Sequence, residues 1–339
     1  MEKLSLKEKT YAIEKAFLSP YATKSENTRG RQREEAACAM RTDFQRDRDR
    51  LIYCKAFRRL KNKTQVFFSP EGDHYITRLT HTLDVAQIAR SIARALSLNE
   101  DLCEAIALGH DLGHTPFGHS GERILNKLSP TGFQHNVQSL RVVDVLEKDG
   151  CGLNLTYEVR DGILNHKKSG NPATPEGKCV SLADRIAYIN HDLNDAVRAG
   201  ILKLSDVPKE IICALGSSSK ERINTAITSI YQNSCDGEVK MDSQVEKASE
   251  QLRSFMFERV YLSGTARAEE EKAERMLSAM YSYFLKNCDK LPEQYVALLD
   301  EYSREQVVCD YLSSMTDRYA IYMFNNVFIP KGWTFVDEK

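Results

Sequence analysis

Apolar residues recur at steps of three and four along much of this chain, and that spacing restricts its fold more than any other feature. Residues 80–97 form one such stretch, and their apolar side chains share one face of a helix: Leu83, Ala86, Ala89, Ile92, Ala93 and Leu96. Residues 136–148 and 181–199 show the same period. Residues 65–68 are the one candidate for a short strand. We therefore predict an all-α protein.

Glycine and proline, which favour loops and turns, are scarce in the chain, with 17 and 9 among 339 residues. This shortage favours helices over a loop-rich β architecture. The clearest loop is residues 167–178, which contain two prolines and two glycines, and residues 216–222 form a second polar stretch. Asn99 is predicted to cap a helix that runs toward Leu108.

The histidines divide the chain into regions with different roles. All eight lie between His74 and His191. We predict an N-terminal segment of residues 1–40, a core of residues 41–204 that carries the chemistry, and a C-terminal helical region of residues 205–339 that packs on the core.

Charge and composition exclude several classes of protein. Lys and Arg total 47 against 48 Asp and Glu, which rules out a wholly basic nucleic-acid coat. No run approaches the ~20 apolar residues of a membrane span, and residues 1–17 lack the apolar centre of a signal peptide. The nine cysteines are scattered without a C-x-x-C pair, which is typical of reduced thiols. We therefore expect a cytoplasmic protein with no membrane partner.

Residues 110–122 read HDLGHTPFGHSGE and hold three histidines, one Asp and one Glu. The adjacent His110 and Asp111 offer an imidazole nitrogen and a carboxylate oxygen at a predicted helix end. This mixed set suits Mn²⁺, Fe²⁺, Co²⁺, Ni²⁺ or Zn²⁺, and Mg²⁺ less well. His81 on the first predicted helix, and Asp184 at the expected start of another, complete an H…HD…D set. Each residue taken alone also has a structural reading, and for Asp184 this is a charge at a helix N-terminus.

This H…HD…D set is the signature of the HD-domain metal-dependent phosphohydrolases. Longer strings resemble the deoxyguanosine triphosphate triphosphohydrolase-like proteins among them: AFRRLKNKTQV, TRLTHTLDVAQIAR, HDLGHTPFGHSGE, FQHNVQSLR and LADRIAYINHD. The resemblance runs from about residue 19 to residue 198 and returns at YLSSMTDRYA near the C-terminus. It implies an HD-domain helical fold with additional C-terminal helices, and a homo-oligomer.

The resemblance also implies an activity, which is metal-dependent hydrolysis of dGTP or of deoxynucleoside triphosphates generally. Attack at the α-phosphate would give a deoxynucleoside and tripolyphosphate. A divalent metal suits this chemistry, since it lowers the pKa of bound water and polarises a phosphoryl oxygen. The metal ligands implied by the resemblance are His81, His110, Asp111 and Asp184.

Four further residues match family positions with catalytic or phosphate-contacting roles: His114, His119, Glu122 and His135. A histidine oriented by a carboxylate suits proton donation to the leaving 5′-oxygen. His119 and Glu122 would meet if this stretch is helical. The residues alone do not rank the four, and any one of them could equally fix the tautomer of a metal ligand.

Substrate contacts are implied at five positions. Arg78 precedes His81 by three residues, and its matching position binds phosphate, which a guanidinium can hold bidentately. Arg185 matches another cationic position. Gln65, Tyr188 and Asp192 match positions around the sugar, although a core tyrosine and a surface aspartate are the plain alternatives for the last two.

A cationic segment precedes the candidate ligands. Residues 29–63 hold twelve Lys and Arg against five Asp and Glu, so the formal charge of −1 conceals a strongly basic stretch. Arg46, Arg48 and Arg50 alternate with acidic residues, which indicates that part of the stretch pairs with itself. Its place ahead of the ligand set suits a polyphosphate held between arginines and a divalent ion.

Two other functions fit the same residues. One is a different HD-domain nucleotide phosphohydrolase: a 5′-nucleotidase, a (p)ppGpp hydrolase or a phosphodiesterase. The other is a nucleotide-sensing regulator that binds single-stranded nucleic acid through the basic stretch.

Overall fold

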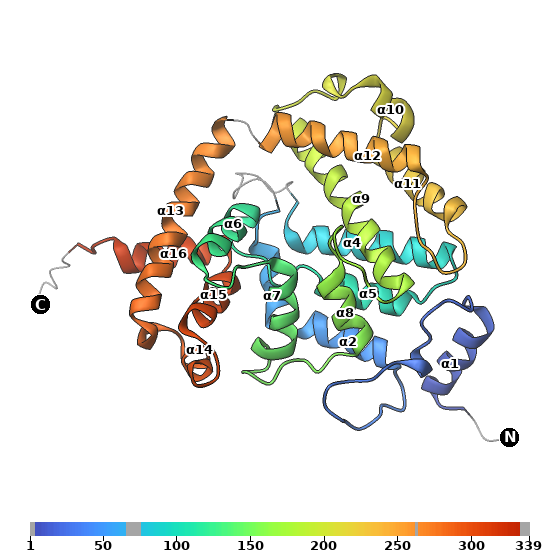
Figure 1. Cartoon of the computed structure of the whole chain (residues 1–339), viewed down its shortest axis with the longest axis horizontal. Coiled ribbons are helices and arrows are strands. Elements are labelled where there is room, and N and C mark those ends of the chain that lie inside the picture. Colours follow the sequence, from blue (N-terminus) through green and yellow to red (C-terminus); the bar gives the residue numbers. More distant parts are fainter. Residues whose placement is uncertain (1–3, 66–75, 262–263, 333–339) are drawn as a thin grey trace, which may run out of the picture.

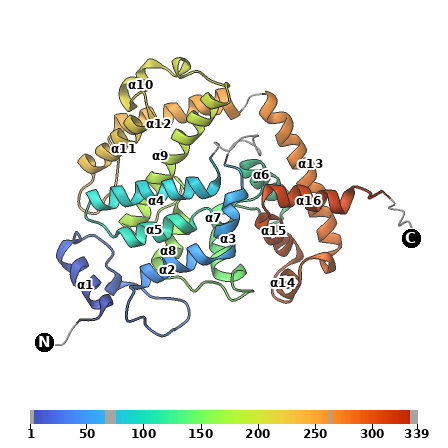
Figure 2. The same ribbon diagram turned by 180° about the vertical axis from the view of Figure 1, so that it is seen from behind.

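The computed structural model describes residues 4–65, 76–261 and 264–332, and these residues fold almost entirely into helices (Figures 1 and 2). Within them the backbone forms no β-strand and only isolated bridges, one of which joins Thr64 to Thr77. The predicted all-α class is therefore confirmed. The α-helices are α1 (Leu6–Phe17), α2 (Asp43–Tyr53), α3 (Lys55–Arg59), α4 (Arg78–Ala95), α5 (Glu100–Gly109), α6 (Gly118–Leu128), α7 (His135–Arg141), α8 (Tyr157–Asn165), α9 (Pro175–Arg198), α10 (Lys209–Leu215), α11 (Ser219–Asn233), α12 (Ser243–Met256), α13 (Gly264–Lys286), α14 (Glu293–Val296), α15 (Arg304–Ser314) and α16 (Asp317–Phe328).

Helix α5 is the centre of the largest hydrophobic cluster. It packs against α2, α4, α8 and α9, and α4 in turn lies against α9 (Figure 1). Leu102, Cys103 and Ile106 of α5 are completely buried. Burial of a Leu or Ile side chain contributes about 1.5–3 kcal/mol, so this central helix and its end, where the candidate ligands begin, are held firmly in place.

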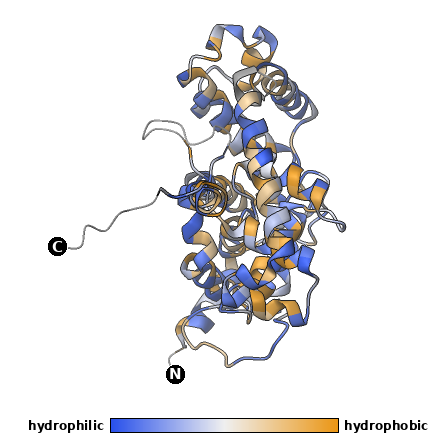
Figure 3. Ribbon diagram, turned by 90° about the vertical axis from the view of Figure 1, so that its left-hand side faces the viewer, coloured by the Kyte–Doolittle hydropathy of each residue, from blue (hydrophilic) through white to orange (hydrophobic). Residues whose placement is uncertain are grey.

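Two smaller clusters attach the C-terminal helices. In one, α6 packs on α13, with Leu125 and Leu277 at the contact and Leu312 of α15 beside them. In the other, Leu193 of α9 packs with Leu252 of α12. Coloured by hydropathy, the helices show hydrophobic turns beside hydrophilic ones, as amphipathic packing requires (Figure 3). The second cluster crosses the boundary expected at residue 204, so that boundary stays a prediction.

A buried carboxylate joins the N-terminal segment to the core. Oε1 of Glu176 accepts hydrogen bonds from the backbone N–H groups of Thr23 and Asn99, each at 3.0 Å. The side chain of Asn99 accepts from the N–H of Leu102 at 3.2 Å, so the predicted cap of α5 is confirmed. These bonds tie residues before α2 to the starts of α5 and α9.

Helix α9 begins inside the loop expected at residues 167–178. Thr174 accepts from the N–H of Gly177, and Pro175 occupies a first-turn position, where its missing N–H is harmless. As a result Asp184 lies in the middle of a long helix and not at its start, and the expectation for its position was wrong. The stretch predicted as one helix over residues 136–148 changes at Arg141 into a π-helical turn, Val142–Leu146.

Two further expectations concern strands and membranes. Gln65 lies in a bend, and residues 66–68 of the candidate strand fall outside the described residues. No helix in the described ranges is both long and apolar enough to cross a bilayer.

Candidate metal centre and adjoining cavity

The four candidate metal ligands come from three helices and converge. His81 lies on α4 and Asp184 on α9, while His110 and Asp111 directly follow α5. Nε2 of His81 is 3.1 Å from Oδ1 of Asp184 and 3.9 Å from Oδ2 of Asp111. Nε2 of His110 is 3.5 Å from Oδ1 of Asp111 and 3.8 Å from Oδ1 of Asp184. Adjacent ligands of one octahedral cation lie about 3 Å apart, so these spacings suit a shared ion.

The tautomer of His110 supports this fit. Its Nδ1 lies 2.6 Å from the carbonyl oxygen of Ala107, and only an N–H can donate to that oxygen. A neutral His110 therefore carries its lone pair on Nε2. This nitrogen is buried without a hydrogen-bond partner in the described part of the chain, and it faces carboxylates of Asp111 and Asp184, which only accept. A cation between them would satisfy all three groups.

The protonation states also suit metal ligands. Burial alone would raise the pKa of Asp111, but neighbouring imidazoles and Arg78 outweigh it and hold that pKa well below its usual range. Burial would likewise raise the pKa of Asp184, but the hydrogen bond from His81 and nearby positive charge lower it. Burial lowers the pKa of His81. The site thus holds ionised carboxylates and a neutral His81 near neutral pH, as metal binding needs.

Arg78 is the first residue of α4 and lies beside this centre. Thr77 caps the helix, so the helix is already formed at Arg78, as the prediction required. The residue is 1% exposed, and its NH1 donates to Oδ2 of Asp111 at 2.8 Å. Its guanidinium also lines the adjoining cavity.

Glu122 organises the histidines on the other side of Asp111. Oε1 accepts from the backbone N–H of His135 at 2.9 Å, and both carboxylate oxygens lie 3.0 Å from Nδ1 of His135. Nδ1 of His119 is 3.6 Å from Oε2, so the predicted meeting of His119 and Glu122 on one helix is observed on α6. Burial would raise the pKa of Glu122, but hydrogen bonds from both histidines outweigh it and place that pKa far below its usual range.

His114, like His110, lies beyond α5, which ends at Gly109. Its Nε2 is 3.2 Å from Oδ1 of Asp111, and its ring stacks on that of His135 with centroids 4.0 Å apart and planes inclined by 15°. Asp111, His114 and His135 place ligand atoms within 4.8 Å of one another. An imidazole nitrogen binds a metal in its ring plane, and two nearly parallel planes do not meet at one ion. The stacking therefore argues against a second cation shared by these two rings.

The cavity beside the centre has a volume of about 780 Å³, within the usual range for ligand sites. All five predicted substrate-contact residues line it, namely Gln65, Arg78, Arg185, Tyr188 and Asp192. Four cations that the sequence did not single out also line it: Arg123, Lys167, Lys168 and Arg253. Burial raises the pKa of Tyr188 to about 12, which keeps its hydroxyl neutral.

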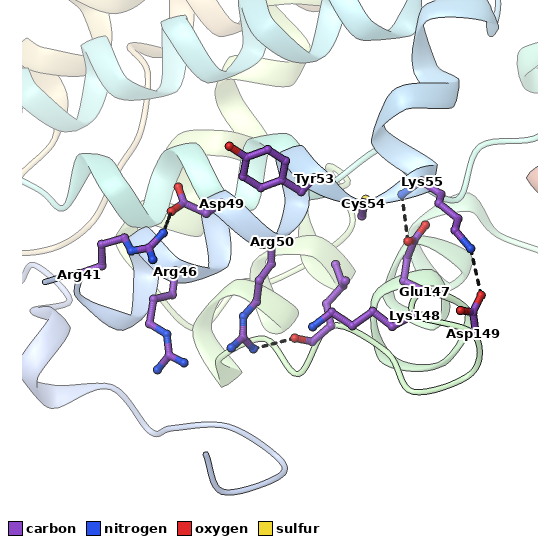
Figure 4. Close-up of a pocket in the computed structure, with 11 residues that line it drawn as sticks. Arg41, Arg46, Asp49, Arg50, Tyr53, Cys54, Lys55, Glu147, Lys148 and Asp149 are labelled. Carbon is purple, nitrogen blue, oxygen red and sulfur yellow. Dashed lines mark hydrogen bonds and ion pairs between the residues drawn. The ribbon is translucent and has the colours of Figure 1, made fainter. Parts of the chain in front are cut away.

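The basic stretch of residues 29–63 lies elsewhere. In the described structure none of its twelve cations lines the cavity, so the expectation that this stretch holds a polyphosphate beside the metal does not hold. Four of its cations, Arg41, Arg46, Arg50 and Lys55, line a second cavity of about 650 Å³, where Arg41 and Lys55 pair with acids (Figure 4). Arg41 pairs with Asp49, and NH2 of Arg50 donates to Glu35 at 2.6 Å. The predicted self-pairing is thus extensive.

Two histidines near the centre were not among the predicted site residues. His166, at the end of α8, has Nδ1 2.7 Å from the carbonyl oxygen of Ile163 and Nε2 3.3 Å from Nε2 of His135. Burial, followed by the charges of His110 and His135, lowers the pKa of His166 to about 3. His191 lies on α9 seven residues after Asp184, and that helical spacing was the available signal for it.

Comparisons with known proteins agree with this arrangement. The HD domain family matches residues 78–189, and the family described as phosphohydrolase-associated domain matches residues 239–326. A deoxyguanosinetriphosphate triphosphohydrolase-like protein of Caldanaerobacter subterraneus subsp. tengcongensis is 57% identical over 331 residues, covering 97% of this chain and 98% of that protein. One from Clostridium tetani is 46% identical over 98% of each chain. The crystal structure of a phosphohydrolase from Bacteroides thetaiotaomicron has a TM-score of 0.52 at 19% identity, covering 82% of this chain and 67% of that one, and this likeness concerns the fold alone.

Proposed function

The chain belongs to the deoxyguanosinetriphosphate triphosphohydrolase-like proteins, which are HD-domain phosphohydrolases, and we propose that it hydrolyses deoxynucleoside triphosphates to a deoxynucleoside and tripolyphosphate. One observation carries this proposal. Three of the four candidate ligands, His81, Asp111 and Asp184, line a cavity that also bears Arg78, Arg185 and further cations. A triphosphate, with close to four negative charges, needs such cations along its length.

We assign the divalent cation to His81, His110, Asp111 and Asp184. The buried Nε2 of His110, which faces two carboxylates, is the feature of this chain that such an ion fits. When bound, the cation supplies a water of lowered pKa and polarises a phosphoryl oxygen. Mn²⁺, Fe²⁺, Co²⁺, Ni²⁺, Zn²⁺ and Mg²⁺ all remain candidates for this mixed nitrogen and oxygen set.

Arg78 is proposed to hold the phosphate nearest the centre. Arg78 lines the cavity and its NH1 is already committed to Asp111, so the remaining donors of its guanidinium are the ones left for a phosphate. Lys168, Arg185 and Arg253 share Glu250 as a partner, at 2.7, 3.8 and 3.8 Å. A triphosphate would compete with Glu250 for these three cations, and with Glu246 for Arg185, which lies 3.5 Å from it.

The acid that protonates the leaving 5′-oxygen is proposed to be His119, oriented by Glu122. Both ring nitrogens of His135 are occupied, one by Glu122 and the other by His166. His119 uses only Nδ1 toward Glu122, and its largely exposed ring lines the cavity, so Nε2 is available to the substrate. His135 then serves as a fixed, polar neighbour of the phosphates, with His114 stacked on it.

The sugar is proposed to lie against Tyr188, with Gln65 and Asp192 beside it. Asp192 and Tyr188 are one turn apart on α9, and all three residues line the cavity. A tyrosine beneath the sugar ring would leave little room for a 2′-hydroxyl. The choice of base, the cytoplasmic location and the homo-oligomeric state stay predictions.

Product analysis tests the proposal. Purified protein is given Mn²⁺ or Mg²⁺ with each of the four dNTPs, singly and in mixture, and the products are resolved. A deoxynucleoside together with tripolyphosphate is the expected result. Release of phosphate or pyrophosphate would favour another HD-domain nucleotide phosphohydrolase, and absence of turnover under every combination would overturn the proposal. His110→Ala, which removes a proposed ligand, is the inactive control.

A further inference from the structure

A chain of hydrogen bonds links the surface to the candidate metal centre through His191. Oδ2 of Asp84 lies 2.8 Å from Nε2 of His191, and Nδ1 of His191 lies 3.3 Å from Nδ1 of His81. Asp84 has a side chain 53% exposed, whereas His191 and His81 are buried. The chain therefore runs from solvent to the ring of a proposed ligand.

The crossing of two helices creates this arrangement. His81 and Asp84 are one turn apart on α4, so their side chains project on the same side of that helix. His191 comes from α9, which packs along α4, and its ring meets that of His81 edge to face at 5.4 Å and 84°. The imidazole of His191 thus contacts both His81 and Asp84 of the neighbouring helix α4.

The direction of both hydrogen bonds follows from the carboxylate of Asp84, which can only accept. The exposed carboxylate of Asp84 accepts, so Nε2 of His191 donates to it. A neutral His191 then has its lone pair on Nδ1 and accepts from Nδ1–H of His81. Where a cation takes the place of the hydrogen bond between Nε2 of His81 and Asp184, this leaves the lone pair of His81 on Nε2, the atom that faces Asp184 and Asp111.

We propose that Asp84 and His191 are positioning residues that hold His81 in the tautomer and orientation needed to bind a divalent cation through Nε2. This inference rests on the metal centre of the proposed function. With the opposite tautomer of His191, its N–H would face the N–H of His81. His81 would then have to lose its Nδ1 proton altogether or move it to Nε2. A proton on Nε2 would use up the lone pair that binds the ion. Partners of this kind are worth 10–100-fold in metal affinity in other proteins.

Four variants separate this role from simple packing. Asp84→Ala changes an exposed residue and is expected to fold. His191→Asn places an amide oxygen near the position of Nδ1 and keeps an acceptor for His81. His191→Phe keeps a ring of similar size but no acceptor. Gln87→Ala, a change at an exposed residue one turn further along α4, is the matched control.

Mn²⁺ affinity, measured from the electron paramagnetic resonance signal of free Mn²⁺, is the first readout. Asp84→Ala is expected to weaken binding about tenfold and His191→Phe at least as much. His191→Asn should bind more tightly than His191→Phe, and Gln87→Ala should match the wild type. If packing alone mattered, the order of the two His191 variants would be reversed. The double variant Asp84→Ala/His191→Phe should bind no more weakly than His191→Phe, since both changes break one chain.

The second readout is the histidine tautomer, from ¹⁵N spectra of the Zn²⁺-loaded protein with labelled histidine. Wild type is expected to show His81 protonated at Nδ1 and His191 protonated at Nε2. Tight Mn²⁺ binding by the wild type with unchanged affinity in Asp84→Ala and His191→Phe would overturn this inference alone. Absence of Mn²⁺ binding by the wild type would overturn the metal centre and this inference together.

Discussion

The backbone N–H of Phe117 donates to Oδ1 of Asp317 at 3.0 Å, across 200 positions of sequence. Oδ2 of the same carboxylate accepts from the backbone N–H of Thr64 at 3.0 Å and from the Thr64 hydroxyl. Nearby, Nζ of Lys63 donates to the carbonyl oxygen of Ser313 at 2.7 Å. The start of α16 and the end of α15 thus hold the two segments that lead into the cavity, from Gln65 on one side and from α6 on the other.

Asp317→Ala is expected to destabilise the protein by about 2–3 kcal/mol, because it leaves the buried N–H of Phe117 and the half-buried N–H of Thr64 without their acceptor. It should also lower kcat/KM, since Phe117 lies at the start of α6, the helix that carries His119. Chemical denaturation and steady-state kinetics check the two effects. Arg318→Ala, at the exposed next residue, is the control. Equal stability of the two variants would show that this carboxylate does not hold the site.

Gly113→Ala is expected to cost about 3 kcal/mol of stability. A Cβ at this position would lie 2.2 Å from the backbone N of Ser139 and 2.6 Å from the carbonyl oxygen of His135, and backbone atoms of a packed helix cannot easily move. Gly200→Ala provides the comparison. Among the residues that the structure describes, none lies within 4 Å of a Cβ built there, so only its left-handed backbone opposes the change, at about 1–2 kcal/mol. Thermal and chemical denaturation of both variants measure the difference, and equal losses would contradict the close approach of α7.

The helices and the H…HD…D set were accessible from sequence because their information is local. The three- and four-residue period of apolar residues predicts α4. The adjacent His110 and Asp111 indicate a pair of metal ligands from two neighbouring positions alone. The start of α9 was misplaced for a local reason as well. Pro175 resembles a loop residue in composition, but at the first turn of a helix it is favourable.

The remaining features depend on contacts between distant segments. In the sequence, His191 is one polar residue of an amphipathic helix. Only the packing of α9 on α4 brings it between His81 and Asp84. Lys168 and Arg253 likewise become cavity cations only when α12 packs over α9. A count of charges indicated residues 29–63 as the phosphate-binding segment instead, because composition does not show which acidic residues pair with these cations.

The metal-free protein is expected to lose stability as the pH falls below about 6.5, in part through His166. Its folded pKa of about 3 lies below the ordinary 6.5, so between these values the unfolded chain binds a proton that the folded protein does not. Stability therefore falls as pH decreases through this window, by about 1.4 kcal/mol per pH unit for one group. His166→Asn lacks this group and keeps a donor for the carbonyl oxygen of Ile163.

Denaturation of chelator-treated protein at pH 7.5, 6 and 5 measures the effect. Wild type should lose about 2 kcal/mol more than His166→Asn between pH 7.5 and 5, because His81 and His114 titrate in both proteins and cancel in the difference. Parallel pH profiles for the two proteins would show that His166 does not remain neutral in the folded state.

Glu122→Gln and His119→Ala are each expected to lower kcat by about 10²–10⁴-fold, the usual contribution of a general acid. Neither residue is a proposed metal ligand, so Mn²⁺ affinity should stay within a factor of about two of the wild type. Loss of a residue that orients a metal ligand would instead weaken binding on the order of tenfold or more. Lys127→Ala, at an exposed position of the same helix α6, is the control for both measurements.

The double variant decides whether the two residues act together. Glu122 orients His119, so once His119 is gone the carboxylate has little left to contribute to proton transfer. Glu122→Gln/His119→Ala should therefore be about as slow as the slower single variant. Multiplicative losses would mean that Glu122 acts through His135, with which it shares two contacts at 3.0 Å, and that proton donation must be reassigned to that histidine.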